Sequence, residues 1–338
     1  MRQAVLTAPG AIEYRDVPKP KAGPGQALLR IARIGICGSD VHAYHGRHPF
    51  MIYPKVQGHE FSGTVEAVGE GVAGFEIGAK VTASPQITCG ACAPCRRGDY
   101  HICDSLKVFG FQTEGVGQDL FAVEAANLIA LPDSFTFEQG AFVEPAAVAV
   151  HATSRAGDMA RRNVVVLGAG PIGNLVAQMC RCRGANVFVT DLSEARLQVA
   201  QECGISSVSL AASESLAEAA ERAFGSAGFD IALDCAGSAA TISAAVEGVN
   251  KGGTIVVVAV FQEKPPVDLA VVGDRELNLV GTLMYRREDY EEAVRRIGAG
   301  EIITEPLESK HFPFEQWPAA YEYIEREGAN VMKVFIDL

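Results

Sequence analysis

The stretch that decides the fold is NVVVLGAGPIGNLVAQMCRCRGANVFVTD, residues 163–191. It has an apolar strand, a glycine-rich turn, an amphipathic helix and a second apolar strand, which is typical of a βαβ unit with parallel strands. Gly168, Gly170 and Gly173 form a GxGxxG motif where the first strand meets the helix. Glycines there allow a tight turn and a close approach to a pyrophosphate, whose charge the helix N-terminus stabilises. The stretch therefore predicts a doubly wound α/β fold that binds a dinucleotide.

The end of the second strand indicates which dinucleotide is bound. Asp191 follows Gly168 by twenty-three residues, where a carboxylate accepts hydrogen bonds from the adenosine ribose. The same carboxylate would repel the 2′-phosphate of NADP, so the sequence favours NAD. Arg196 either flanks the adenine or is a solvated arginine on a helix face. The residues expected to contact the cofactor are Gly168, Gly170, Pro171, Ile172, Gly173, Asp191 and Arg196.

The pattern of elements changes near residue 150. Before it, the sequence is rich in Gly and Pro with short β-type runs, which indicates an irregular, mostly β domain. Residues 151–283 alternate strands with helices and form the predicted dinucleotide-binding domain. Residues 284–338 hold two amphipathic helical patterns and a terminal strand that so short a tail cannot support alone. We therefore expect residues 284–338 to complete the domain formed by residues 1–150.

Length and charge narrow the class of protein. At about 150 residues per domain, a chain of 338 residues is expected to form two domains. The net charge of −12 disfavours nucleic acid and anionic membrane surfaces as partners. The first twenty residues show neither a secretion leader nor a membrane-spanning stretch, so we expect a cytoplasmic enzyme that acts on a small molecule.

Four of the nine cysteines gather in CGACAPCRRGDYHIC, residues 89–103. The spacing CxxCxxCx7C allows one loop to surround a tetrahedral ion with four thiolates, which predicts a structural zinc without an open position. Two disulfides, an iron–sulfur cluster and a nucleic-acid-binding zinc ribbon are the alternatives. The predicted ligands are Cys89, Cys92, Cys95 and Cys103. The later cysteines are interpreted as small core residues: Cys180, Cys182, Cys203 and Cys235.

A second metal site is indicated by Cys37 in GICGSD and His59 in GHE. A single buried thiol or histidine is more often part of the core than a metal ligand. Together with Glu60, Glu144, the nicotinamide site and the four-cysteine loop, however, they favour a catalytic metal.

These motifs together resemble the zinc-containing medium-chain dehydrogenase/reductase family over nearly the whole chain. The similarity is carried by GICGSDVHAYHG (35–46), GHEFSGTVEAVG (58–69), the four-cysteine segment, GAGPIG (168–173) and VTDLSEARL (189–197). The segment FVEPAAVAVHA, residues 142–152, is closer to sorbitol, threonine and sugar-acid dehydrogenases. Where the alcohol dehydrogenases of the family place a second cysteine ligand, this chain has Glu144.

The resemblance implies a GroES-like catalytic domain, made from both chain ends, around a Rossmann domain. It also implies two zinc ions per subunit, of which the catalytic one is held by Cys37 and His59 with Glu60 or Glu144 supplying a carboxylate. In a straight strand Glu60 would point away from His59, so binding by both requires a bend or a shift of the metal.

The resemblance also implies a route for the proton. Ser39 takes the hydroxyl proton and passes it through the cofactor ribose towards His42 or solvent, although Glu144 with a bound water is an alternative. We expect Asp40 to be structural.

The substrate is less well determined by the sequence. Residues after the Ser39 region either line the substrate cleft or lie in an exposed loop: Tyr44, His45, Arg47, His48 and Phe50. Polyol dehydrogenases of the family place an arginine beside a tyrosine, whereas this chain has Met284 beside Tyr285. Arg286 and Arg287 either meet a substrate carboxylate or lie on the surface.

The predicted function is hydride transfer from a secondary alcohol of a polyol, sugar or sugar acid to NAD. An L-threonine 3-dehydrogenase is the alternative enzyme, and a non-catalytic NADH-binding sensor is the alternative of another class. Cys37 and His59 disfavour a zinc-free quinone or enoyl reductase. The apolar run LNLVGTL, residues 277–283, is expected to form an edge strand that pairs across a dimer, and the four-cysteine loop to extend contacts to a homotetramer.

Overall fold

The computed structural model describes residues 1–338, and the chain forms two compact units. The first contains Met1–Glu144, Arg286–Gly298 and Glu308–Leu338, and the second contains Pro145–Tyr285 and Ala299–Leu307. Both chain ends therefore belong to the first unit. The first division falls inside helix α3 (Phe137–Ser154), whereas the sequence placed it at residue 150.

Residues 299–307 also differ from the expected division, because they return to the second unit. The Gln178 side chain holds this segment by donating to the Ile303 carbonyl (3.0 Å) and accepting from the Ile303 amide (2.7 Å). A buried polar side chain in the middle of α4 thus anchors a segment that the sequence assigns to the tail.

The second unit is built on a six-stranded sheet in which every pairing is parallel. Its strands, in spatial order, are β13 (Ser207–Leu210), β12 (Asn186–Asp191), β11 (Asn163–Leu167), β14 (Ile231–Asp234), β15 (Thr254–Val257) and β16 (Asn278–Gly281). Its helices are α4 (Pro171–Cys182), α5 (Glu194–Glu202), α6 (Leu216–Phe224), α7 (Ala239–Gly248) and α8 (Leu269–Asp274). The strand order reverses between β11 and β14, which confirms the doubly wound α/β fold and marks the carboxyl ends of these strands as the ligand-binding edge.

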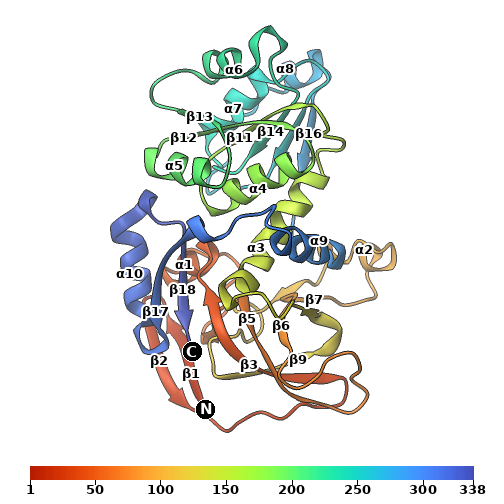
Figure 1. The fold of residues 1–338 in the computed structure, drawn as a ribbon, viewed down its shortest axis with the longest axis vertical. Helices are drawn as coiled ribbons and strands as arrows, with labels where there is room; N and C mark the ends of the chain where they lie inside the picture. Colours follow the sequence, from red (N-terminus) through yellow and green to blue (C-terminus); the bar gives the residue numbers. More distant parts are fainter. The chain divides into compact units, whose positions relative to one another are not determined.

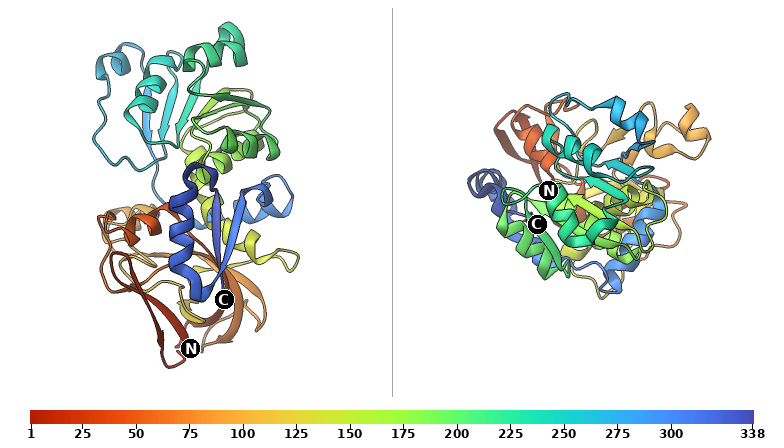
Figure 2. Two further views of the ribbon diagram at one scale, coloured as in Figure 1. Left: turned by 90° about the vertical axis from the view of Figure 1, so that its left-hand side faces the viewer. Right: turned by 90° about the horizontal axis from the view of Figure 1, so that it is seen from above.

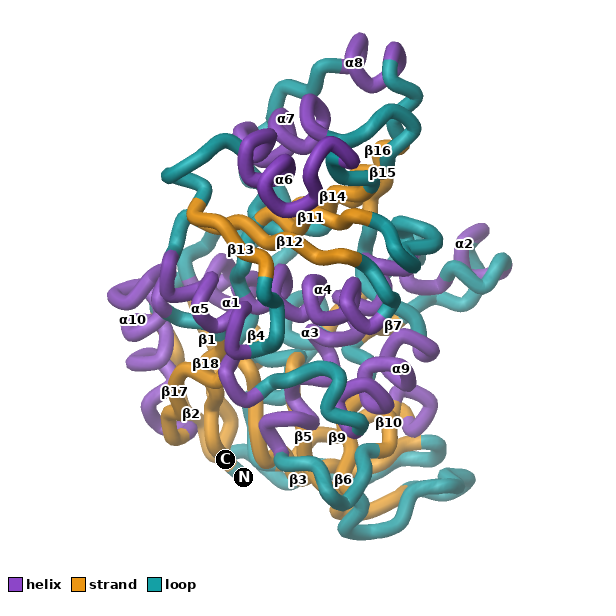
Figure 3. Tube along the Cα trace, turned by 45° about the horizontal axis from the view of Figure 1, so that its top comes forward, coloured by secondary structure: helices purple, strands orange, loops and turns teal.

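Helices cover both faces of this sheet, with α4 and α5 on one face and α6 and α7 on the other (Figures 1 and 3). The strands are accordingly apolar on both sides, and Val165, Phe188 and Ile255 are completely buried. The glycine turn packs closely against the first strand: a Cβ on Gly173 would lie 1.8 Å from the Gly168 carbonyl oxygen. Only glycine at this position allows α4 to begin so close to β11.

The first unit contains a seven-stranded sheet in the order β10-β6-β5-β3-β18-β17, with β9 also pairing with β3. Its strands are β3 (Gln26–Gly35), β5 (Glu60–Val68), β6 (Lys80–Ala83), β9 (Leu120–Glu124), β10 (Leu128–Ala130), β17 (Glu308–Pro313) and β18 (Lys333–Asp337). A three-stranded sheet holds β1 (Arg2–Ala8), β2 (Ala11–Asp16) and β4 (Lys55–Val56), and a small ladder joins β7 (Gln86–Ile87) to β8 (Lys107–Val108). The helices are α1 (Gly38–Tyr44), α2 (Ala93–Arg96), α9 (Arg287–Gly298) and α10 (Trp317–Glu327).

The C-terminal segment completes the first unit. Strand β18 pairs antiparallel with β3 and parallel with β17, and α10 lies beside these two C-terminal strands (Figure 2). Trp317 and Tyr321 of α10 are buried in the main core of this unit, with Ile34, Phe61 and Ile336. The last residues of the chain therefore form part of the core that carries the site described below.

No helix in the chain combines the length and the apolar character that crossing a bilayer requires.

Candidate functional site

Three potential metal ligands meet where β3 ends and β5 begins. The ligand atoms of Cys37, His59 and Glu60 all lie within 4.8 Å of one another. Cys37 is the residue before helix α1, and Glu60 is the first residue of β5, opposite Gly35 of β3. His59 precedes the strand, and Gly58 before it has a φ of 95°, so the chain bends there and the strict alternation of a straight strand does not apply.

The donor set of this cluster fits zinc. A thiolate, an imidazole nitrogen and a carboxylate oxygen are ligands that zinc prefers, and three protein ligands leave one tetrahedral position for a substrate. His59 and Glu60 are buried, with 5% and 1% of their surface exposed. A partly buried thiol and a buried carboxylate beside a buried histidine have no obvious role in packing, so a bound cation accounts for them best.

Asp40 lies beside both Cys37 and His59. Its carboxylate accepts a hydrogen bond from the Cys37 amide (3.0 Å), and Asp40 Oδ1 lies 3.6 Å from His59 Nδ1. Burial raises the pKa of Asp40. Burial alone would lower the pKa of His59, but the Asp40 charge and the hydrogen bond with Cys37 outweigh it and hold the pKa well above its usual value. Asp40 thus has the structural role expected for it, as a capping residue of α1 beside the candidate ligands.

Lys333 is a neighbour of this cluster that the sequence analysis missed. Its Nζ lies 2.5 Å from Glu60 Oε2 and donates to the Ile36 carbonyl oxygen at 3.2 Å. Burial would lower the pKa of Lys333, but the attraction of Glu60 raises it. The one available signal was a lone cation inside the apolar terminal run VMKVFIDL.

Glu144 lies close by but outside the ligand cluster. It is buried in α3 and acts electrostatically on both His59 and Lys333. The structure groups the carboxylate of Glu60 with the ligand atoms of Cys37 and His59, within 4.8 Å of one another. Glu144 does not belong to that group.

Ser39 and His42 lie on α1, immediately after Cys37. Their spacing of three residues places them on neighbouring positions of one helical face. Both side chains are only partly exposed. The proton route through the cofactor ribose stays a prediction.

The candidate substrate residues that follow fall into two groups. Tyr44 stacks on Tyr321 with ring centroids 4.4 Å apart, and His45 pairs with Glu325 at 2.6 Å, so both connect α1 to α10. His48 instead stacks on Phe111 at 4.3 Å. Arg47 and Phe50 are exposed, as the loop alternative predicted.

Phe111 is a second residue that the sequence analysis missed. Its ring centroid is 5.3 Å from that of His59, and 4% of its surface is exposed. Burial lowers the pKa of the neighbouring His48, and the nearby His42 and His59 lower it further. An uncharged His48 stacked on Phe111 makes the surroundings of the candidate metal site less polar. The only signal in the sequence was the pair of aromatic residues in VFGFQ.

The dinucleotide turn of the second unit has the expected local geometry. Gly168 has a φ of 98°, and Asp191 accepts hydrogen bonds from the amides of Ala169 (2.6 Å) and Ser193 (2.8 Å). These bonds fix the carboxylate at the end of β12. The Arg196 guanidinium lies 3.8 Å from the point where a Cβ on Gly170 would stand, so this side chain packs beside the turn and does not extend into solvent. Pro171 and Ile172 begin α4 after the turn.

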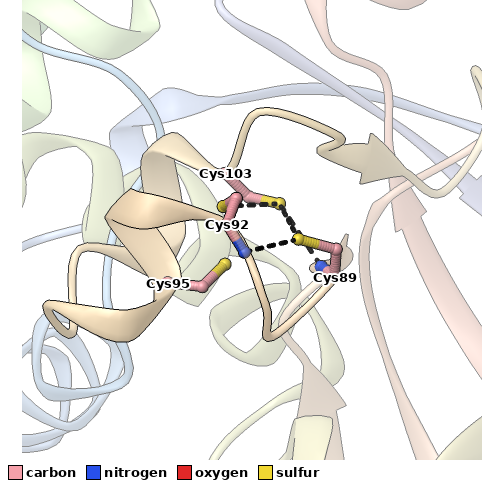
Figure 4. Close-up of side chains that lie close together, drawn as sticks. All are labelled: Cys89, Cys92, Cys95 and Cys103. Carbon is pink, nitrogen blue, oxygen red and sulfur yellow. Dashed lines mark hydrogen bonds between the residues drawn. The ribbon is translucent and has the colours of Figure 1, made fainter.

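The four cysteines of the loop meet as the spacing predicts (Figure 4). Their ligand atoms lie within 4.8 Å of one another, with Sγ separations of 3.5 Å for Cys89–Cys103 and 3.8 Å for Cys92–Cys103. A tetrahedron of zinc–sulfur bonds of about 2.3 Å has edges of about 3.8 Å. All nine cysteines are free thiols, which disfavours the disulfide alternative. Hydrogen bonds from the backbone of Ala91 and Cys92 lower the pKa of Cys89 to about 6, whereas desolvation and the neighbouring thiols of Cys92 and Cys103 raise the pKa of Cys95 to about 12.

The remaining cysteines lie away from both clusters. Cys180 and Cys203 are buried, and burial raises the pKa of each to about 12, so both are unreactive core residues.

Arg286 and Arg287 attach the four-cysteine loop to α9. Arg286 Nη2 donates to Asp99 Oδ1 (2.6 Å), and the Arg287 amide donates to the Tyr100 hydroxyl (2.6 Å). The Arg287 guanidinium also donates to the carbonyl oxygens of Ala126 and Leu128. Both arginines thus have structural partners, which disfavours their use for a substrate carboxylate.

Comparison with known proteins identifies the two parts of the chain. Residues 23–133 match the family model of the alcohol dehydrogenase GroES-like domain, and residues 171–299 match that of the zinc-binding dehydrogenases. The chain is 36% identical to a 2-dehydro-3-deoxy-L-galactonate 5-dehydrogenase of Pseudoalteromonas atlantica, over 88% of this chain and 87% of the relative. It is 34% identical to human sorbitol dehydrogenase, over 97% and 94%. Identity to an L-threonine 3-dehydrogenase of Idiomarina loihiensis is 36%, over 94% of each chain.

Solved structures agree with this similarity over the full length. A zinc-binding dehydrogenase of Sinorhizobium meliloti bound to NADP superposes with a TM-score of 0.93 at 28% identity. An alcohol dehydrogenase of Escherichia coli complexed with NADH superposes with the same TM-score of 0.93 at 27% identity. Each comparison covers 100% of this chain and 99% of the other.

The four-cysteine cluster leads to a prediction about metal content. Replacing Cys95 with serine removes one of four thiolates from a closed shell, so zinc content should fall by one equivalent per subunit. The loop at residues 89–103 should also become sensitive to limited proteolysis. Cys182→Ser, which changes a thiol outside both clusters, is the matched control. Unchanged zinc content in a folded Cys95→Ser protein would contradict this assignment.

Proposed function

Because the chain belongs to the zinc-dependent medium-chain dehydrogenase family, we propose that it oxidises a secondary alcohol of a polyol, sugar or sugar acid to a ketone with NAD. The observation that carries this proposal is the cluster of Cys37, His59 and Glu60, whose three donors leave a metal position open. The full-length similarity to a sugar-acid dehydrogenase and to sorbitol dehydrogenase supports the substrate class.

In this proposal Cys37 and His59 hold the catalytic zinc, and the four-cysteine loop holds a second, structural zinc. When bound, zinc polarises the substrate hydroxyl as a Lewis acid, and NAD accepts the hydride. Asp40 holds the backbone at Cys37 through its amide, and its carboxylate lies 3.6 Å from the His59 imidazole. His48 and Phe111 provide an apolar wall beside His59.

Proton removal is assigned to helix α1. Ser39 accepts the hydroxyl proton while it releases its own towards His42, which lies one turn further along the same face and passes a proton to solvent. Glu144 with a water molecule is the alternative base, and its burial beside His59 supports that possibility.

L-Threonine is the second candidate substrate. The L-threonine 3-dehydrogenase of Idiomarina loihiensis and the sugar-acid dehydrogenase are both 36% identical to this chain. Neither Arg286 nor Arg287 favours a carboxylate-bearing substrate, because the Arg286 guanidinium binds Asp99 of the four-cysteine loop and the Arg287 guanidinium binds the carbonyl oxygens of Ala126 and Leu128.

We also propose a cytoplasmic location, supported by nine free cysteines and a thiolate cluster that a reducing compartment preserves.

The activity is tested by NADH formation across polyols, sugar acids and L-threonine, with zinc content measured in the same sample. Turnover of polyols or sugar acids is expected. Cys37→Ser should abolish turnover because it weakens the metal site, while NADH binding, measured by fluorescence, stays intact. Cys182→Ser should retain activity. Turnover of threonine alone would overturn the substrate class, and an active Cys37→Ser enzyme would overturn zinc catalysis. A zinc-replete protein without any turnover would favour an NADH sensor.

The choice of NAD over NADP is proposed from Asp191. Its carboxylate, fixed by two backbone amides, would repel a 2′-phosphate. Asp191→Ser should raise kcat/KM for NADP relative to NAD by about tenfold or more, which corresponds to about 1.4 kcal/mol. Glu194→Ser, which removes an exposed carboxylate at the start of α5, should leave the ratio unchanged. A wild-type preference for NADP would contradict the proposal.

We propose further that the protein is a homodimer or homotetramer. Strand β16 lies at the edge of its sheet. Leu279 in this strand is 42% exposed, and Leu283 just after the strand is 54% exposed. Sedimentation velocity should show an oligomer, and Leu279→Lys should shift it towards smaller species. Ile77→Lys, at an apolar residue that is 72% exposed in the first unit, should not. A monomeric wild type would refute the proposal.

A further inference from the structure

The two segments that carry Cys37 and His59 are joined by one buried side chain, that of Gln57. Cys37 belongs to the connection from β3 to α1, whereas His59 belongs to the connection from β4 to β5. Gln57 lies two residues before His59, and its Nε2 donates a hydrogen bond to the Asp40 carbonyl oxygen in α1 at 3.2 Å. Because the Asp40 carboxylate accepts from the Cys37 amide, the Gln57 side chain reaches the same turn that holds Cys37.

The other end of the Gln57 amide is bound by helix α10. The Tyr321 hydroxyl donates to Gln57 Oε1 at 2.9 Å, and the two residues are 0% and 3% exposed. The Asp40 carbonyl oxygen can only accept a hydrogen bond, so the nitrogen of the amide must face it and the oxygen must face Tyr321. Both ends of the amide are therefore satisfied in a single orientation.

The main chain around Gln57 is held separately from its side chain. The amides of Gly115 and Gly117 donate to the carbonyl oxygens of Val56 (2.8 Å) and Gln57 (2.9 Å). A Cβ on Gly115 would lie 2.6 Å from the Gln57 carbonyl oxygen, so this close approach requires glycine. The segment that leads to His59 is thus a support of its own, and the Gln57 side chain connects it to α1.

Helix α1 depends on contacts of this kind. It has seven residues, and an isolated helix shorter than about 12–15 residues is at best marginally stable. At the end of α1 the Tyr44 ring stacks on Tyr321, with an interplanar angle of 20°. Tyr321 therefore touches α1 through its ring and Gln57 through its hydroxyl.

These buried hydrogen bonds are costly to remove one partner at a time. Without the Tyr321 hydroxyl, Gln57 Oε1 would stay buried without its donor, and a buried acceptor in that state costs more than the bond itself contributes. Without the Gln57 amide, α1 would lose its side-chain hydrogen bond to the segment that carries His59. The separation of Cys37 and His59 would then be set less firmly.

From this arrangement we propose that Gln57 is a positioning residue that holds the Cys37 turn against the His59 segment, so that both side chains bind one metal ion, and that Tyr321 orients its amide. This role rests on the proposed zinc site at Cys37 and His59. It gives α10 a part in metal binding, although that helix supplies no ligand to the cluster.

The first test is the retention of zinc in Gln57→Leu, a side chain of similar size that makes neither hydrogen bond. Samples are dialysed against increasing concentrations of a chelator, and the remaining zinc is counted. The catalytic zinc of Gln57→Leu should leave at a chelator concentration about tenfold or more below that of the wild type. The zinc of the four-cysteine loop should be retained equally in both proteins, which provides an internal reference.

Gln178→Leu separates a loss of positioning from a loss of stability. Gln178 is a fully buried glutamine of the second unit, and its amide also makes hydrogen bonds at both ends. Its replacement should lower the melting temperature and leave zinc retention unchanged. If folded Gln57→Leu keeps its zinc as the wild type does, or if both variants lose zinc equally, Gln57 does not position the ligands.

Tyr321→Phe tests whether Tyr321 acts through Gln57, because it keeps the stacked ring and removes only the hydroxyl. The variant should lose zinc at a chelator concentration between those of the wild type and Gln57→Leu. The double variant should match Gln57→Leu, since no amide is left to orient. Tyr323→Phe, on the same helix, should match the wild type. A greater loss in the double variant, or unchanged retention in Tyr321→Phe, would contradict the assigned role.

The zinc count also distinguishes this role from the zinc site on which it rests. A wild type with a single zinc equivalent, all of it retained in Cys37→Ser, would refute the catalytic zinc site and the role of Gln57 with it. Two equivalents in the wild type, one of them lost in Cys37→Ser but not weakened in Gln57→Leu, would overturn the role of Gln57 alone.

Discussion

The pairing of strand β18 with β3 is the contact on which the candidate metal site depends. It brings Lys333 next to Gly35, and the pairing of β3 with β5 brings Glu60 to the same point. Cys37 follows β3 and His59 precedes β5, so the ends of two paired strands supply the potential ligands. The metal site is thus a product of sheet register, and a slip of one residue would turn Glu60 to the other face.

Register explains which parts of the site could be predicted from the sequence. The glycine turn and Asp191 belong to one continuous βαβ unit, and the four cysteines lie within one loop, so their spacing alone indicates their geometry. The motifs around Cys37 and His59 indicated a metal site, but the roles of these residues and of Glu144 came from resemblance to a family, because nothing local shows that their elements meet. The placement of Glu60 among the ligand atoms depends on the bend at Gly58, which the sequence left open.

Lys333 and Phe111 could not be predicted because their roles depend on distant pairings. Lys333 is 273 residues from Glu60 in the sequence, and an apolar terminal strand does not reveal which strand it will join. The same holds for Arg286, whose partner Asp99 is 187 residues away. Both arginines were open to a substrate role until the structure placed them against the four-cysteine loop. Long-range electrostatic partners are therefore the part of this site that the sequence does not disclose.

The chain passes between its two units four times, at residues 144–145, 285–286, 298–299 and 307–308. During synthesis the strands β3 and β5 emerge before the second unit, whereas β18 emerges only after the whole of it. The second unit can form its parallel sheet while the first still lacks an inner strand. Loss of only the final six residues would remove Lys333 and every strand residue of β18. A nascent or slightly shortened chain would therefore possess its dinucleotide fold before, or without, a finished metal centre.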